Sequence, residues 1–299
     1  MGAKARLHWV FVGSRGIRAG WSVLIFLSIL SAIGAAVHFA THSRVGLPPK
    51  IVPPRYLLVR EVAWFAAIFG VTAIMGRIEG LRAWSYGLVG PRPAANFVAG
   101  WLGGLFCLSL MVGVLYAGGY IAFDGFALHG MQAVGYGLVW LLAFLFVGLG
   151  EETFFRGYLQ STLARGIGFW PGALVLSLSF GAAHLGNGGE TPAGIAGVVV
   201  FGLVFCLLLW LSGSLWLGIG FHCAWDWAQS YLYGTPDSGM IMQGHLFMTN
   251  AKGSVPISGG SAGPEASVLL IPVLLVGLLV MIIVLRSLGL IQRKEAVLF

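Results

Sequence analysis

The sequence predicts an all-α polytopic membrane protein, with about eight transmembrane helices around a polar intramembrane cavity. Three observations favour this class: 58% of the 299 residues are hydrophobic, only 9% are charged, and long apolar runs recur along the chain. Soluble domains carry roughly 25% charged residues, whereas a helix of about 20 apolar residues crosses a bilayer. Residues 1–299 are therefore expected to form a single membrane domain.

Eight apolar runs are expected to become membrane-spanning helices. They are residues 21–40, 59–78, 94–123, 131–150, 171–185, 193–211, 214–231 and 267–285. The 46 glycines suit helices that pack closely in lipid, where small residues line the contacts. Cys107, Cys206 and Cys223 match no disulfide framework and no zinc ribbon, so they are expected to be small core residues.

Basic residues predict how the chain is oriented in the membrane. Residues 1–20 form a basic segment that the positive-inside rule places in the cytoplasm, and an even number of spans returns the C-terminus to the same side. The basic loop 42–58 conflicts with this rule, so either it lies along the headgroups or the first spans are unusual. A cleaved signal peptide is an alternative for the first run, although that run is long for one. Residues 235–266, rich in Gly, Ser and Pro, are predicted to be a flexible external loop.

The net charge of +7 does not indicate nucleic acid as a partner. The basic residues fall mostly between and beside the apolar runs, where topology explains them. Membrane lipid is the partner that this composition predicts.

The first polar motif is "EETFFR", residues 151–156, directly after an apolar run. Glu152 and Arg156 are four residues apart with the acid first, which favours an ion pair on one helix face. Glu151 is turned about 100° from Glu152, so it is expected to remain free for chemistry. The alternative is a cytoplasmic helix end with an ordinary surface salt bridge.

Two further motifs place ionisable residues inside apolar runs, where such residues are functional candidates by default. In "FGAAH", residues 180–184, His184 shares a helix face with an aromatic ring; alone, it is also consistent with a satisfied core histidine. In "HCAWD", His222 and Asp226 are four apart, and a carboxylate can fix the orientation of an imidazole. A buried packing pair is the alternative there.

Taken in order on successive helices, the three motifs resemble the CAAX protease and bacteriocin-processing family. This family is also called the type II CAAX prenyl endopeptidase or Abi family of intramembrane proteases. The resemblance covers residues 131–231, which are predicted to be the catalytic core. It implies an eight-helix fold with a conical cavity open to membrane and cytoplasm, and peptide-bond hydrolysis without a covalent intermediate.

The resemblance also implies a role for each motif. Glu151 and His184 would hold and deprotonate the attacking water, and His222 with Asp226 would lie where the oxyanion develops. Relatives often have Asn at the position of Asp226, which can donate a hydrogen bond, whereas an ionised Asp only accepts. Either Asp226 is protonated, or it orients His222, which then stabilises the oxyanion.

The resemblance favours a reaction without a bound metal, so no cofactor is expected. Zinc is the alternative, because Glu151, His184 and His222 supply the three N/O ligands that a catalytic zinc site needs. The chain contains no His-Glu-x-x-His motif.

The predicted function is that of an intramembrane endopeptidase in a bacterial inner membrane, with both termini in the cytoplasm. Its substrate would be a membrane-associated peptide or protein; a lipidated tail, a bacteriocin leader and a regulatory membrane peptide are all compatible. Two other classes stay open. One is a non-catalytic scaffold or immunity factor on the same fold, and the other is a proton-coupled transporter, since intramembrane acids and histidines also form proton relays.

Overall fold

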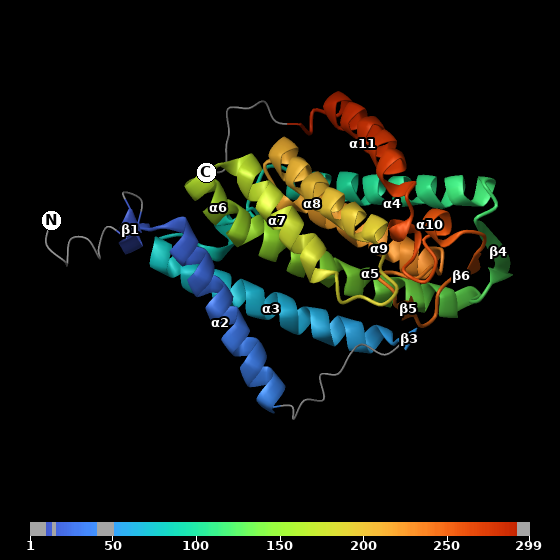
Figure 1. Cartoon of the computed structure of the whole chain (residues 1–299), viewed down its shortest axis with the longest axis horizontal. Helices are drawn as coiled ribbons and strands as arrows, with labels where there is room; N and C mark the ends of the chain where they lie inside the picture. Colours follow the sequence, from blue (N-terminus) through green and yellow to red (C-terminus); the bar gives the residue numbers. More distant parts are fainter. Residues whose placement is uncertain (1–9, 14–15, 41–50, 292–299) are drawn as a thin grey trace, which may run out of the picture.

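A computed structural model describes residues 10–13, 16–40 and 51–291, and helices dominate this part of the chain (Figure 1). The longer helices are α2 (Ala19–Ala40), α3 (Pro54–Glu79), α4 (Pro93–Ala117), α5 (Gly130–Glu152), α6 (Gln160–Ile167), α7 (Phe169–Ala183), α8 (Pro192–Ser212), α9 (Leu215–Trp227) and α11 (Leu270–Ser287). Two π-helical segments, η2 (Thr153–Leu159) and η3 (Ala228–Leu232), extend α5 and α9. The short elements are η1 (Ala83–Ser85), α10 (Val255–Ser258) and η4 (Pro264–Ala266).

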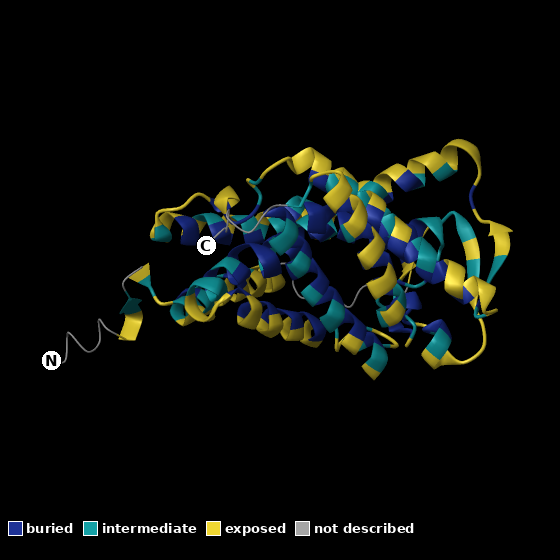
Figure 2. Ribbon diagram, turned by 90° about the horizontal axis from the view of Figure 1, so that it is seen from above, coloured by how far each residue is buried: buried dark blue, intermediate teal, exposed yellow. Residues whose placement is uncertain are grey.

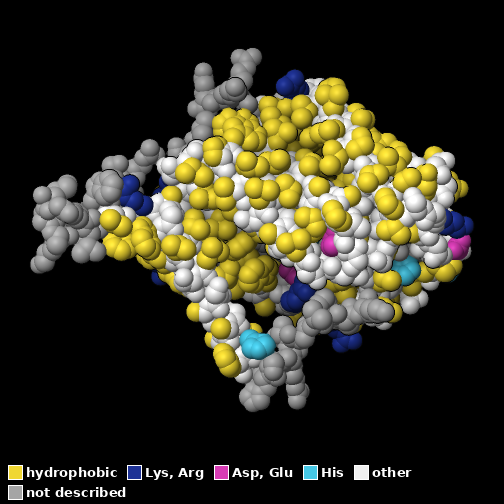
Figure 3. Space-filling view, viewed as in Figure 1, with side chains coloured by type: hydrophobic (Ala, Val, Ile, Leu, Met, Phe, Trp, Pro, Cys, Tyr) yellow, Lys and Arg dark blue, Asp and Glu magenta, His cyan; other side chains and the backbone are white. Residues whose placement is uncertain are grey.

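Six helical runs within the described residues are long and apolar enough to cross a bilayer. They are α2, α3, α4, the continuous run Gly130–Ile167, α8 and α11. Helix α7 is apolar but has 15 residues, and α9 has 13 before it passes into η3. Hydrophobic side chains cover most of the face shown in Figure 3. The all-α membrane class is confirmed, while the number of eight spans stays a prediction.

The predicted orientation depends largely on segments outside the described residues. Most of the basic segment 1–20, residues 42–50 of the loop 42–58, and the tail 292–299 belong to them. The positions of both termini relative to the membrane therefore stay predictions.

Helix ends follow ordinary capping chemistry. Pro54 and Pro93 occupy first-turn positions of α3 and α4, where the absent N–H costs nothing. Helix α3 ends at Gly80, whose φ of 74° is readily adopted by glycine. Thr191 and Ser214 cap α8 and α9, because their hydroxyl groups accept backbone N–H bonds from the first turn.

The expected helix over residues 94–123 is too long at its C-terminal end. Helix α4 ends at Ala117, Gly119 then takes a φ of 76°, and the chain enters strand β4 (Ile121–Phe126). Strand β4 pairs antiparallel with β6 (Phe247–Ala251). The apolar residues after the glycines belong to a strand because a distant segment supplies the hydrogen-bonding partner, which local hydropathy does not reveal.

Residues 235–266, predicted as a flexible external loop, carry folded elements. Besides β6, this segment contains β5 (Ile241–Met242), which pairs in parallel with β3 (Ile51–Val52) just before α3. It also contains α10 and η4, and η4 contacts α8. The segment thus closes one end of the helix bundle (Figure 1). Its mobility and its side of the membrane stay predictions. A further short pair, β1 (Val12–Gly13) with β2 (Gly16–Ile17), precedes α2.

Helix α9 lies in the middle of the bundle and packs against α4 almost backbone to backbone. A Cβ atom added at Gly100 or Gly104 of α4 would collide with the carbonyl oxygen of Leu217 or Phe221. Gly220 of α9 approaches the backbone of Phe97 in the same way. Figure 2 shows the resulting contrast between buried inner helix faces and exposed outer ones. Close backbone packing against α4 therefore fixes the position of α9, the helix that carries His222 and Asp226.

Candidate active site

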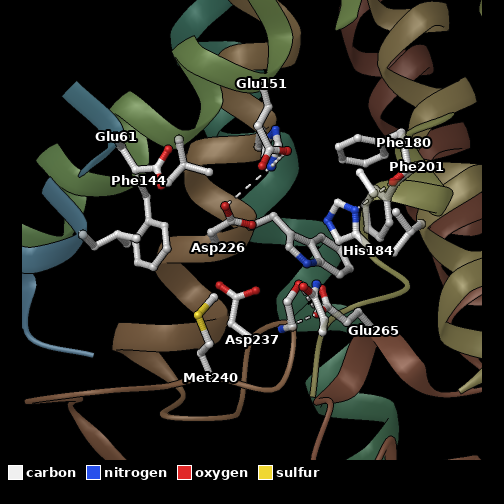
Figure 4. A pocket seen from close by; sticks show the side chains of 18 of the residues that line it. Glu61, Phe144, Glu151, Phe180, His184, Phe201, Asp226, Asp237, Met240 and Glu265 are labelled. Carbon is white, nitrogen blue, oxygen red and sulfur yellow. Dashed lines mark hydrogen bonds and ion pairs between the residues drawn. The ribbon is translucent and has the colours of Figure 1, made fainter. Parts of the chain in front are cut away.

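A cavity of about 340 Å³ opens between α3, α5, α7, α8 and α9. Its lining includes four of the six predicted site residues, Glu151, His184, His222 and Asp226. In Figure 4 the carboxyl groups of Glu151 and Asp226 face the same space, and the imidazole of His184 lies across from them. Three separate helical segments thus bring one free acid and two imidazoles to one cavity.

The two adjacent glutamates lie where α5 passes into the π-helical segment η2. They fall inside the continuous helical run Gly130–Ile167, and not at a helix end. The side chain of Glu151 is 28% exposed, whereas that of Glu152 is 1% exposed. π-helical turns inside α-helices often mark functional sites, and here the turn follows directly after the acid pair.

Glu152 and Arg156 form the expected ion pair. Nη1 of Arg156 lies 3.2 Å from Oε1 of Glu152, and both side chains are only 1% exposed. The alternative of a surface salt bridge at a cytoplasmic helix end is therefore wrong. Nε and Nη2 of Arg156 have no hydrogen-bond partner among the described residues. Instead, the guanidinium lies over the rings of Phe155, Phe180 and Phe205 at 5.4, 4.6 and 5.0 Å.

His222 contacts three carboxyl groups. Its Nδ1 lies 3.1 Å from Oε1 of Glu152, so that Nδ1–H donates to a buried carboxylate. Its Nε2 lies 3.5 Å from Oδ2 of Asp226 and 3.7 Å from Oε2 of Glu151. The bond to Glu152 fixes the ring, and Nε2 is the nitrogen on the side of Glu151 and Asp226, which line the cavity.

His184 is held by its own helix end. It follows the last residue of α7, and its Nδ1 lies 2.8 Å from the carbonyl oxygen of Phe180. Because that carbonyl can only accept, Nδ1 carries the proton and Nε2 remains an acceptor in the neutral ring. The rings of Phe180 and His184 are 4.7 Å apart at 63°. Nε2 can then accept a hydrogen bond from a water molecule in the cavity.

Three cavity acids lie outside the predicted motifs. They are Glu61 on α3 and Asp237 and Glu265 in the segment that follows α9, each less than a tenth exposed. Arg60, also in the lining, pairs with Glu61 at 2.6 Å. Burial raises the pKa of Asp237 to about 6. Burial, and then the nearby carboxyl group of Asp237, raises the pKa of Glu265 to about 8.

The sequence contains a signal for only one of these acids. Arg60 and Glu61 interrupt the start of an apolar run, and a charged pair at that place is a candidate by the rule for intramembrane ionisable residues. Asp237 and Glu265 lie among Gly, Ser and Pro residues, where acids are ordinary. They reach the cavity only because strand pairing folds their segment back onto the bundle.

The described side chains do not form a preassembled zinc site, and zinc stays the alternative. Across residues 10–13, 16–40 and 51–291, no three His, Cys, Asp or Glu side chains are placed as ligands of one metal ion. Nδ1 of His222 is bound to Glu152, and Nδ1 of His184 is bound to Phe180, which leaves Nε2 as the nitrogen of each ring that a ligand could reach. The three candidate ligands Glu151, His184 and His222 share a cavity without forming a ligand set.

Comparison with known families gives one match. Residues 133–228 match the family model described as "Type II CAAX prenyl endopeptidase Rce1-like". The matched range contains all six predicted site residues, whereas Glu61, Asp237 and Glu265 lie outside it. No curated protein and no solved structure matches the chain.

Proposed function

Residues 133–228 belong to the Rce1-like family of type II CAAX prenyl endopeptidases, and on that premise we propose that the chain hydrolyses a peptide bond through a water molecule activated by Glu151. Family membership and the apolar helices identify it as an intramembrane protease at the level of the family. The observation that supports the finer proposal is the shared cavity of Glu151, His184, His222 and Asp226.

Glu151 is the proposed general base. It is the partly exposed member of the acid pair, and Arg156 is occupied by Glu152. The water bound between Glu151 and Nε2 of His184 would give a proton to the carboxylate while its oxygen attacks the scissile carbonyl carbon. The C–N bond then breaks, and the proton passes to the leaving amine. No covalent enzyme intermediate is formed.

His222 is the proposed stabiliser of the tetrahedral oxyanion. Glu152 accepts from Nδ1–H, so the role requires the protonated ring, in which Nε2–H is presented to the cavity in one orientation. A donor fixed in this way before reaction is worth a rate factor of about 10² to 10³ in other hydrolases. Asp226, 3.5 Å from Nε2, is proposed to orient the imidazole.

Replacement of Glu151 by Gln tests the function. Proteomic comparison of membranes with wild-type and Glu151→Gln protein should show a cleaved species that disappears in the variant, because Gln cannot accept the proton. Asp124→Asn is the matched control, since that carboxyl group is exposed on β4 and far in sequence from the motifs. A function that survives in Glu151→Gln would indicate a scaffold, and loss of pH-dependent transport alone would indicate a transporter.

The proposed reaction uses no metal. Purified protein in metal-stripped buffer with a chelator should therefore keep its cleavage activity. A loss of activity that zinc alone restores would overturn this part of the proposal.

The substrate is proposed to be a membrane-associated peptide or protein. A lipidated tail, a bacteriocin leader and a regulatory membrane peptide are compatible with the cavity. The protein is proposed to lie in a bacterial inner membrane with both termini cytoplasmic, which the basic residues beside the first and last spans support.

A further inference from the structure

Phe205 lies outside the three motifs, yet it lines the cavity beside them. It belongs to α8, in the middle of an uninterrupted apolar helix, and its side chain is 3% exposed. From sequence it is one aromatic residue among 20 phenylalanines. In the structure, Phe205 is distinguished by lining the cavity next to His222.

The ring of Phe205 stacks on the imidazole of His222. The two ring centroids are 4.8 Å apart, and the planes differ by 21°. The same ring lies 5.0 Å from the guanidinium carbon of Arg156. Phe205 therefore contacts both the imidazole proposed to stabilise the oxyanion and the buried cation that compensates Glu152.

A second ring repeats this arrangement at the other imidazole. Phe180 lies 4.6 Å from the guanidinium carbon of Arg156 and 4.7 Å from the ring of His184. Each imidazole thus contacts one phenyl ring, and both rings contact the same guanidinium. Phe180 also holds His184 through its backbone carbonyl, whereas Phe205 touches His222 through its ring alone.

The hydrogen bond to Glu152 fixes the Nδ1 edge of the His222 ring, but it leaves the tilt of the ring plane to other contacts. Carboxylate oxygens lie 3.1, 3.5 and 3.7 Å from its two ring nitrogens. A partial rotation of the imidazole about the Cβ–Cγ bond would tilt the ring and move Nε2 relative to Asp226 and Glu151. A phenyl ring packed parallel to the imidazole opposes that rotation, because the rotated ring would collide with it.

We propose that Phe205 is a positioning residue that holds the imidazole of His222 in the orientation required for hydrolysis. The proposal rests on the proposed peptidase function. It concerns a side chain that acts through His222 and does not itself react.

Three variants separate positioning from general packing. Phe205→Met removes the ring face at similar volume, and we expect kcat to fall about tenfold with KM within about twofold, the scale of one aromatic contact. Phe205→Tyr keeps the ring face, so kcat should return to within about threefold of wild type. Phe26→Met is the matched control: Phe26 on α2 is fully buried and packs against Tyr158 and Phe154 instead of an imidazole. It should lower the melting temperature and leave kcat within about twofold.

A spectroscopic measurement does not depend on turnover. In protein labelled with ¹³C at histidine Cε1, the His222 resonance, assigned by its loss in His222→Gln, should lose its ring-current shift in Phe205→Met and keep it in Phe26→Met. An unchanged resonance in Phe205→Met, or an equal loss of kcat in both methionine variants, would overturn the proposal. If wild type and Glu151→Gln do not differ in cleavage, the proposed peptidase function is rejected. The shift of the His222 resonance in Phe205→Met then still shows whether Phe205 positions the imidazole.

Discussion

Oε1 of Glu152 lies 3.1 Å from Nδ1 of His222, so the second acid of the pair is joined directly to the imidazole at the cavity. The same oxygen lies 3.2 Å from Nη1 of Arg156. A buried carboxylate is stable only when it is compensated. Arg156 therefore stabilises the acid that orients His222, which connects the first motif of the sequence to the third.

Removal of Arg156 should strongly destabilise the fold. Arg156→Met removes the guanidinium from a carboxylate that is 1% exposed and leaves it bound to His222 alone, and the expected loss in free energy of unfolding is about 3 kcal/mol. Unfolding by SDS titration in mixed micelles measures this loss. The double variant Arg156→Met with Glu152→Gln should recover part of it, because the uncompensated charge is gone. A double variant that is less stable than the single one would contradict this explanation.

The close contact of α4 with α9 should be intolerant of one added methyl group. Gly104→Ala places a Cβ against the carbonyl oxygen of Phe221, whereas Gly113→Ala on the same helix meets no atom within 4 Å. We expect Gly104→Ala to lower both the melting temperature and kcat, since the helix carrying His222 must move. Gly113→Ala should leave both unchanged. Equal effects of the two substitutions would show that the close approach is unimportant.

Asp226→Asn distinguishes two roles for residue 226. Oδ2 of Asp226 lies 3.5 Å from Nε2 of His222, and a carboxylate there helps to orient the ring. We therefore expect kcat to fall about tenfold in Asp226→Asn, a loss typical of an orienting contact of about 1.4 kcal/mol. Steady-state cleavage rates measure this. A rate that is kept or increased would mean that residue 226 itself donates a hydrogen bond to the oxyanion.

The acids that follow α9 should make stability depend on pH. The pKa of Glu265 is raised by burial from 4.5 to about 8. A carboxyl group whose pKa is higher in the folded state than in the unfolded state stabilises the fold fully at pH values below the unfolded-state pKa. This stabilisation is lost as the pH rises through the folded-state pKa. The wild-type melting temperature should therefore fall between pH 5 and pH 8.5, and Glu265→Gln should reduce that fall. An equally steep fall in the variant would exclude Glu265 as its cause.

The helices and the three motifs could be predicted because their signals are local. Hydropathy locates the spans, and four-residue spacing places Glu152 beside Arg156 and His222 beside Asp226, as the structure shows. The contact between Glu152 and His222 joins residues 70 positions apart, and no spacing rule reaches that far. It depends on how α5 and α9 cross.

The remaining cavity residues could not be predicted for two different reasons. Glu61 has a local signal, since it is an acid at the start of an apolar run, but nothing local relates α3 to the motifs. Asp237 and Glu265 have no local signal at all. Their placement follows from the pairing of β5 with β3 and of β6 with β4, in which the partners are separated by more than a hundred residues.

The pairing of β5 with β3 ties two parts of the cavity together. Strand β3 leads into α3, which carries Glu61, and strand β5 includes Met242 of the cavity lining. Helix α9 is locked to α4, so it offers no freedom to widen the space. A displacement of α3 would therefore pull on the paired strands, so the positions of Glu61 and Met242 depend on each other although they are 181 positions apart in the sequence.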